Sequence, residues 1–204
     1  MSTAVDGGAI PRGGGREAIA AAAREVFHER GYHGASIRDI AGRAGLSLSA
    51  LYYWHPSKQD LLAALIEEHT LEYFRRCDEA LADIPLTDST ARLAALVRAT
   101  VVYRVEQQVE SNISAREWRN LEAGQGERLE GLRTKASTIW ADIVDEGVRL
   151  GTFRCPHPAD ARRAAQAACN AIAQWYRPDG TLSAEDLVER YTLIVMRIVD
   201  AEPA

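Results

Sequence analysis

The chain has 204 residues, of which 47% are hydrophobic and 26% charged, with a formal net charge of −5. This length suffices for one large or two small domains with real cores, and the composition is ordinary for a globular protein in water. The sequence has no run of 18 apolar residues and no basic N-terminal region followed by an apolar core, which argues against a membrane span and a secretion signal.

The chain begins with a Gly-rich stretch, residues 1–15, that shows no periodicity and predicts a disordered N-terminal arm. A first helix is predicted from Arg16 to Arg30 and should end at Gly31. Its apolar stripe consists of Ile19, Ala22, Ala23, Val26 and Phe27.

The stretch from Ser36 to Lys58 has the pattern of a helix-turn-helix. Ser36 is a favourable N-cap, and Asp39 completes an S-x-x-D capping box. Gly45 stands where the first helix must stop with a positive φ, and a short second helix follows over Leu48–Trp54. By spacing alone, the stretch is either a DNA-reading unit or a small helical hairpin inside a larger bundle.

The exposed face of the second helix carries short polar, apolar and phenolic groups. Such a helix can enter a major groove, while a nearby lysine and a serine at a helix N-terminus can reach phosphates. The predicted DNA-binding residues are Ser36, Arg38, Ser47, Leu48, Ser49, Tyr52, Tyr53 and Lys58. Residues 1–60 carry seven basic and six acidic side chains, so the acidic excess lies outside this head.

This N-terminal region resembles the DNA-binding domain of TetR-family repressors. The resemblance rests on F-x-E-x-G-Y, S-I-R-D-I-A, A-G-L-S, L-Y-Y and P-S-K, in that order. His55 departs from the pattern, because the family usually has an aromatic residue before P-S-K. The resemblance implies a three-helix DNA-binding domain over residues 16–56.

The rest of the chain shows no strand-like alternation, so we expect an all-α fold. A long helix from Ser57 to about Leu81 should join the head to a C-terminal helical domain for ligand binding and dimerisation, residues 57–204. Gly124 and Gly126 are predicted to break one junction between helices. The further predicted helices are Ser89–Gln108, Ser111–Glu122, Glu127–Leu150, Pro158–Trp175 and Ser183–Asp200.

The last two predicted helices have the composition of an interface. One is rich in small residues that suit close helix approach, and the other has an apolar surface wider than one stripe. They could form an intersubunit four-helix bundle or an internal core, and the resemblance to TetR repressors, which dimerise through their last two helices, favours a homodimer. The predicted dimerisation residues are Ala161, Ala165, Ala168, Ile172, Tyr191, Val195 and Ile198.

Aromatic residues with arginines nearby suit a mostly apolar ligand with an anionic end, although they could equally be core and solvated surface. The predicted ligand-binding residues are Tyr103, Arg116, Trp118, Arg119, Trp140, Trp175 and Arg177. We favour Arg177 as the anchor, since the Pro178–Asp179–Gly180 turn should hold it at a helix end.

Three segments, REWRNLEAGQGERLEGLR, DEGVRLGTFR and WYRPDGTLSAEDLVERY, are similar to the ligand domain of TetR-type repressors of fatty-acid and steroid-ring catabolism. Those repressors respond to CoA thioesters, so the resemblance implies an acyl-CoA-type effector. The alternative is a lipophilic or aromatic drug-like compound, with an exporter as the regulated gene.

Nothing in the sequence indicates catalysis. The five histidines are scattered without metal-ligand spacing, and Cys77, Cys155 and Cys169 lack a C-x-x-C pair, so we expect no metal, no cofactor and no disulfide framework in a reducing cytoplasm. We therefore predict a ligand-responsive repressor that binds a palindromic double-stranded operator and is not an enzyme. The alternative from another class is a helical interaction protein that does not bind DNA.

Overall fold

The computed structural model describes residues 14–201, and within that range the chain is helical, apart from turns and one isolated antiparallel bridge between Phe153 and Ala201. The all-α prediction is confirmed. In chain order the helices are α1 (Gly14–Gly34), α2 (Ile37–Arg43), α3 (Leu48–Trp54), α4 (Lys58–Leu81), α5 (Ser89–Glu106), α6 (Gln108–Glu117), the 3₁₀ turn η1 (Trp118–Asn120), α7 (Ala123–Leu150), α8 (Pro158–Trp175) and α9 (Ala184–Ile198).

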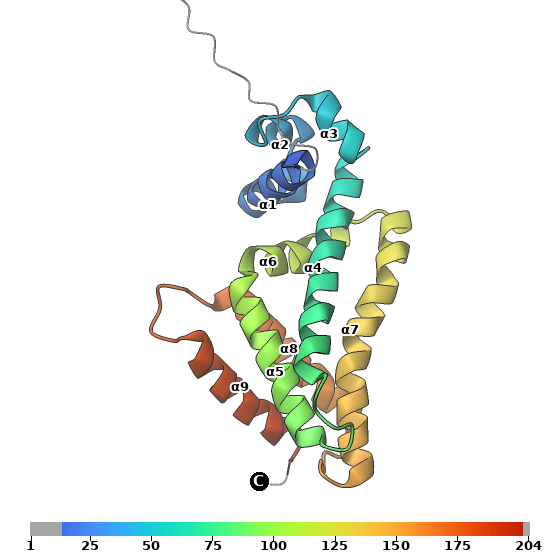
Figure 1. Cartoon of the computed structure of the whole chain (residues 1–204), viewed down its shortest axis with the longest axis vertical. Coiled ribbons are helices and arrows are strands. Elements are labelled where there is room, and N and C mark those ends of the chain that lie inside the picture. Colours follow the sequence, from blue (N-terminus) through green and yellow to red (C-terminus); the bar gives the residue numbers. More distant parts are fainter. Residues whose placement is uncertain (1–13, 202–204) are drawn as a thin grey trace, which may run out of the picture.

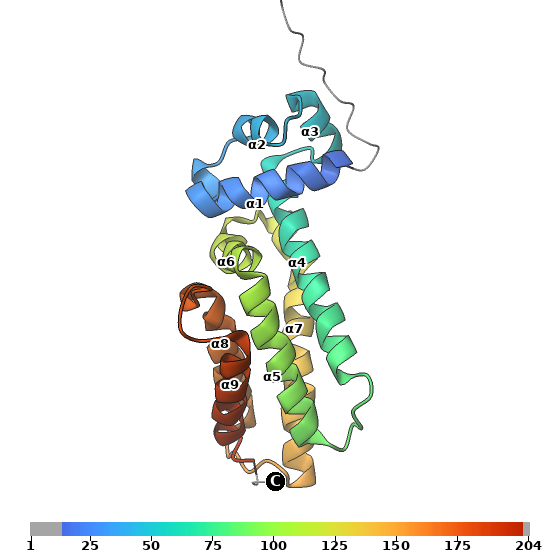
Figure 2. The same ribbon diagram turned by 60° about the vertical axis from the view of Figure 1, so that its left-hand side comes forward.

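The molecule is elongated, with a small head at one end of a helical bundle. Helices α1, α2 and α3 form the head, and α4 leads from it into the bundle (Figure 1). Within the bundle, α5 packs against α4, α7, α8 and α9. Helix α6 lies beneath α1, between the head and the rest of the bundle (Figure 2). Between residues 14 and 201 we find no helix with the length and apolar character needed to cross a membrane.

Serine side chains cap three of the predicted helix starts. The hydroxyl oxygens of Ser36, Ser57 and Ser183 each accept a hydrogen bond from the backbone N–H three residues further on, at 3.0 to 3.1 Å. At Ser183 the capping box is reciprocal, because the Asp186 carboxylate accepts from the Ser183 backbone N–H at 2.8 Å. These local bonds satisfy N–H groups that would otherwise lack a partner and so fix where each helix begins.

Several glycines differ from their expected roles. The arm predicted over residues 1–15 lies outside the described residues, except that Gly14 and Gly15 already begin α1. Gly31 interrupts α1 with φ 65° and ψ 175°, where the sequence predicted its end. Gly124 and Gly126 do not break the chain but lie in the first turns of α7. Glycine costs a helix only about 1 kcal/mol, and burial of the following apolar residues compensates that cost.

Buried apolar side chains form two clusters. One unites the head with the first half of α4, and Ile113 of α6 and Leu129 of α7 extend it. The other fills the bundle around α5 and includes Tyr73, Tyr103 and Trp140. Helix α4 contributes to both clusters, so the head and the bundle are connected through one helix whose apolar face runs from one core into the other.

Two positions in the bundle core have particular chemistry. Gly147 of α7 lies against the ring of buried Phe153, and a Cβ at this position would come within 2.8 Å of the ring's Cγ and closer still to two other ring carbons. The three free cysteines, Cys77, Cys155 and Cys169, are all buried. Burial raises the pKa of Cys77 to about 11 and that of Cys169 to about 12, and it also raises the pKa of Cys155.

The side-chain amide of Gln59, at the start of α4, joins the head to the bundle. Its Nε2 donates to the Tyr32 hydroxyl of the head at 2.8 Å and to the Asn120 carbonyl of η1 at 2.7 Å. Its Oε1 accepts from the backbone N–H of Glu122, just before α7, at 3.0 Å. One buried amide therefore connects the end of α1, η1 and the start of α7.

Candidate functional site

The helix-turn-helix of the head follows from the predicted signals. The backbone N–H of Leu46 donates to the Ala41 carbonyl at 3.0 Å, and Gly45 takes φ 68° in the turn between α2 and α3. Ala41 and Leu51 are buried where the two helices meet, so that α3 presents its other face to solvent. Tyr53 is 80% exposed, which leaves this face open to a partner.

Six of the eight predicted DNA-binding residues are exposed on the head: Ser36, Arg38, Ser47, Ser49, Tyr52 and Tyr53. Arg38 forms no ion pair within residues 14–201, whereas Arg30 pairs with Asp39 at 3.1 Å and Arg43 with Glu29 at 2.7 Å. Its guanidinium thus remains available to a phosphate.

The other two predicted residues are partly buried. Leu48 packs against the head cluster, which limits its reach toward base edges. The Lys58 Nζ donates to the backbone carbonyls of Tyr32 and Ala35, at 2.8 and 2.9 Å, and lies 4.1 Å from the centre of the Tyr32 ring. Lys58 therefore holds the end of α1 onto α4, a structural role that the sequence did not predict.

His55, the departure from the family pattern, ends α3 and is 7% exposed. Burial and the positive charge of Arg16 lower the pKa of His55, so the ring is neutral at physiological pH. An uncharged imidazole can therefore be buried at the position where the family usually has an aromatic side chain.

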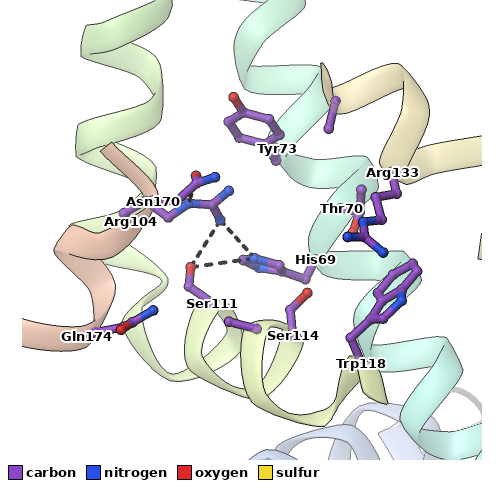
Figure 3. A pocket seen from close by; sticks show the side chains of 12 residues that line it. His69, Thr70, Tyr73, Arg104, Ser111, Ser114, Trp118, Arg133, Asn170 and Gln174 are labelled. Atoms are coloured by element: carbon purple, nitrogen blue, oxygen red, sulfur yellow. Dashed lines mark hydrogen bonds between the residues drawn. The ribbon is translucent and has the colours of Figure 1, made fainter. Parts of the chain in front are cut away.

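A cavity of about 320 Å³ opens in the bundle below the head (Figure 3). Residues of α4, α5, α6, η1, α7 and α8 line it, and most of them are polar. They are His69, Thr70, Tyr73, Arg104, Ser111, Ser114, Ala115, Trp118, Arg133, Ala136, Asn170 and Gln174.

Arg104 of α5 lines this cavity, and its guanidinium donates hydrogen bonds to neutral side chains. Its Nε donates to Asn170 Oδ1 at 3.0 Å, and its Nη1 donates to His69 Nε2 at 3.1 Å and to Ser111 Oγ at 3.2 Å (Figure 3). The guanidinium also lies 5.0 Å from the centre of the Tyr73 ring. None of these partners carries a negative charge.

His69 takes one proton arrangement that satisfies all its contacts. The Tyr103 hydroxyl donates to the His69 carbonyl at 2.6 Å, so its oxygen is free to accept from His69 Nδ1 at 2.9 Å, and His69 Nε2 accepts from Arg104. Burial, together with the charges of Arg104 and Arg24, lowers the pKa of His69 to about 3. His69 is therefore neutral and orients the guanidinium rather than adding a charge.

The wall behind the cluster is aromatic. Trp140 Nε1 donates to the Tyr73 hydroxyl at 3.3 Å, and that hydroxyl contacts the Thr100 hydroxyl at 3.0 Å. At the open side, the Arg133 guanidinium carbon lies 5.5 Å from the centre of the Trp118 ring, and the Arg133 side chain is 64% exposed. The cavity thus has a partly buried cation, Arg104, at one end and a mostly exposed cation, Arg133, at its opening.

The predicted ligand-binding residues divide between this cavity and other places. Trp118 lines the cavity, while Tyr103 and Trp140 are buried behind its lining. Arg116 lines a separate hollow between α1 and α6. Arg119 is exposed on η1 outside the lining.

Trp175 and Arg177, where α8 ends, also lie outside the lining. Arg177 is exposed in the loop before α9, and Trp175 stacks on Tyr191 with ring centres 6.5 Å apart. The turn after Arg177 holds it on the surface rather than over the cavity. Arg177 is therefore not placed to contact a ligand in the cavity, which Arg104 and Arg133 line instead.

Sequence reasoning missed the polar residues at the centre of the cavity, above all Arg104, His69, Ser111 and Asn170. A signal for Arg104 was present, because it interrupts the otherwise apolar stretch T-V-V-Y-R-V of α5. A lone arginine in a buried helical stripe is rare and is held there by specific partners.

The predicted dimerisation residues lie mostly inside the single chain. Ala165, Ile172 and Val195 are fully buried in the bundle core, and Ala161 is 9% exposed, so these four contact their own chain rather than a partner. Ala168, Tyr191 and Ile198 are partly exposed. The apolar side chains that α8 and α9 turn outward are instead Trp175, Leu193 and Ile194, of which Leu193 is 57% exposed.

Comparison with known proteins gives the family. The family described as "Bacterial regulatory proteins, tetR family" matches residues 19–65, and the one described as "Tetracyclin repressor-like, C-terminal domain" matches residues 86–199. The transcriptional repressor KstR2 of Mycolicibacterium smegmatis is 29% identical over 184 residues, covering 89% of this chain and 88% of the relative.

Solved structures share the fold. A bacterial regulatory protein in the tetR family from Rhodococcus RHA1 superposes with a TM-score of 0.85, at 23% identity, over 93% of this chain and 98% of its own. AibR, solved in complex with isovaleryl coenzyme A and operator DNA, gives a TM-score of 0.81 at 20% identity, over 92% and 99%.

Residues 14–201 contain no group of three or more histidine, cysteine or acidic side chains placed to hold a metal ion. The helix-turn-helix head, the helical bundle behind it and a family match that spans more than half of the chain lead to one assignment. The chain belongs to the tetR family of bacterial transcription regulators.

Proposed function

We propose that the chain is a homodimeric repressor whose heads, over residues 16–56, read a palindromic operator and release it when an effector enters the cavity of the domain over residues 57–204. The observation that carries this proposal is the position of α6. Ser111, Ser114 and Ala115 of α6 line the cavity, while Ile113 of the same helix is buried in the head cluster. A ligand that displaces α6 therefore also displaces the support of α1.

The DNA contacts are divided by chemistry. On α3, Ser49 and Tyr53 face outward and are the residues for base edges, whereas Arg38 and Tyr52 supply groups for phosphates. Two heads related by a dyad read half-sites about 34–36 Å apart or a multiple of that distance. The outward apolar side chains Trp175, Leu193 and Ile194 are the central contacts of the partner subunit, with Ala168, Tyr191 and Ile198 at its margin.

The effector is proposed to be an acyl-CoA thioester. The description of one similar protein supports this class, since AibR was solved with isovaleryl coenzyme A. The cavity, at about 320 Å³, is at the small end of the ~300–1,000 Å³ range of ligand pockets. It would accept the acyl group, with the CoA portion extending past Trp118 and Arg133 toward solvent.

The test is a gel shift with the DNA upstream of the protein's own gene, followed by titration with CoA thioesters. We expect a salt-sensitive, sequence-preferring shift that a CoA thioester reverses. Arg38→Ala should weaken operator and unrelated DNA by similar factors, whereas Ser49→Ala should change the preferred sequence. Arg177→Ala, outside the cavity, serves as the matched control and should leave both steps unchanged.

The absence of any sequence-preferring shift would contradict the repressor role. A shift that lipophilic drug-like compounds reverse, and no CoA thioester does, would replace the proposed effector class by the alternative one and point to an exporter as the regulated gene.

A further inference from the structure

The cavity holds a positive charge that the protein itself does not neutralise. Arg104 forms no ion pair with any carboxylate between residues 14 and 201. The acidic residues that follow it in the sequence have other partners, since Glu106 pairs with Arg76 at 2.8 Å and Glu110 with Arg24 at 3.4 Å. An enclosed guanidinium surrounded only by neutral groups is a costly arrangement, and a bound anion would offset that cost.

The donors of Arg104 show which part of it is free. Its Nε donates to Asn170, and its Nη1 donates to His69 and Ser111. No acceptor in the described part of the chain bonds to its Nη2, and Arg104 lines the cavity. The arginine is thus held in place by two of its nitrogens and leaves the third for a ligand.

Asn170 extends this donor edge. Because its Oδ1 accepts from Arg104 Nε, its Nδ2 amino group must point away from the guanidinium, and Asn170 also lines the cavity. The Nη2 group of Arg104 and the Nδ2 group of Asn170 are therefore two N–H donors on the lining of one cavity. Two such donors can serve the two oxygens of one carboxylate.

We propose that the effector carries a carboxylate at the end that enters the cavity, and that Arg104, assisted by Asn170, binds it. This inference rests on the proposed function, because it assigns the ligand class of the same cavity. For a CoA thioester, the acyl group would then be that of a dicarboxylic acid, joined to CoA through one carboxyl group and anchored through the other.

The opening of the cavity is consistent with such a two-ended ligand. Arg133 is mostly exposed and stacks near Trp118, so a second cation stands where the CoA portion would leave the cavity. Thr70, Ser114 and Gln174 also line the cavity and offer neutral polar contacts. A purely apolar acyl chain would leave the Arg104 Nη2 group without an acceptor, which disfavours it.

The experiment compares two CoA thioesters that differ only at the inner end of the acyl chain. Binding of adipoyl-CoA and hexanoyl-CoA to the full-length protein without DNA is measured by calorimetry, and glutaryl-CoA and valeryl-CoA repeat the comparison at a shorter length. We expect the carboxylate-bearing thioester to bind about ten- to hundredfold more tightly at one or both lengths, as expected for a charge-assisted hydrogen bond in an enclosed site.

Arg104→Gln should abolish this preference, and Arg104→Lys, which keeps the charge but not the fork, should reduce it. The matched control is Arg98→Gln, on the same helix but exposed and paired with Glu185, which should keep the full preference. Circular dichroism establishes that each variant is folded. If Arg104→Gln fails to fold, Arg104→Lys and Asn170→Ala carry the test, because both should still lower the preference.

Equal or tighter binding of the monocarboxylic thioesters at both lengths would overturn the carboxylate anchor, and so would a preference that persists in Arg104→Gln. The proposed function is judged separately by operator release. If hexanoyl-CoA releases the operator and the protein shows no preference for a carboxylate, the repressor function stands and the carboxylate anchor is rejected.

If adipoyl-CoA binds through Arg104 but does not release the operator, the anchor stands and operator release is rejected as the response. Arg104-dependent binding of free adipate as tight as that of adipoyl-CoA would support the anchor and show that CoA adds no affinity.

Discussion

Replacing Gln59 by leucine tests the connection between the head and the bundle. The side-chain amide is 7% exposed and makes hydrogen bonds to Tyr32, Asn120 and Glu122 at 2.7 to 3.0 Å. Each such bond contributes about 1 kcal/mol net, and a buried group left without a partner costs about 1–3 kcal/mol. The leucine leaves the Glu122 N–H and the Asn120 carbonyl unpaired, while its added apolar contact recovers part of the loss. We therefore expect the free energy of unfolding to fall by about 2–4 kcal/mol.

The assay is urea denaturation at a fixed protein concentration, combined with effector titration of the operator complex. Gln125→Leu is the matched control, because that amide makes a single 3.3 Å bond to Asp60. We expect Gln125→Leu to change the stability by less than about 0.5 kcal/mol. In Gln59→Leu the effector concentration needed for release should also shift, because α1, η1 and α7 lose their common contact. Unchanged stability together with an unchanged titration curve would refute the reasoning.

Three further predictions concern stability, pH and DNA binding. Gly147→Ala should lower the free energy of unfolding by about 1–3 kcal/mol in urea denaturation, since its methyl group would meet the Phe153 ring, and adding Phe153→Leu should recover part of the loss. Because the folded pKa of His69 is about 3, below its ordinary value, the unfolded chain takes up the proton first and stability falls with falling pH. From pH 6.5 to 5 the free energy of unfolding of the wild type should fall by about 1.6 kcal/mol more than that of His69→Gln, and equal pH slopes would count against this. Lys58→Met should lower both the melting temperature and the affinity for DNA, because the Lys58 ammonium donates to two backbone carbonyls of the head. Weaker DNA binding at an unchanged melting temperature would instead indicate that Lys58 acts only as a phosphate contact.

The sequence predicted those parts of the fold that local chemistry determines. Ser36 and Ser183 cap their helices through bonds that span three residues, and Gly45 takes the positive φ that its turn requires. Such signals are complete within a few residues, so they can be recognised without the rest of the molecule. The helix-turn-helix, and with it the exposed face of α3, could therefore be placed in advance.

The cavity could not be placed in the same way. The partners of Arg104 come from α4, α6 and α8, and only the packing of these helices brings His69, Ser111 and Asn170 together. Arg177 was favoured on the strength of a local turn, but a turn fixes the direction of the chain and not the location of a space between helices. Likewise, Ala165 was assigned to an interface by its small size, a property that suits close packing inside the bundle equally well.

The buried cysteines make the molecule suitable for attaching a single probe. Alkylating reagents react with the thiolate, and burial both shields Cys77, Cys155 and Cys169 and keeps them protonated near neutral pH. A cysteine introduced by Tyr53→Cys, at a position 80% exposed on α3, would be the most reactive thiol in the part of the chain described here. Fluorophores attached there in a dimer would report the separation of the two reading helices by energy transfer, without first removing any native cysteine.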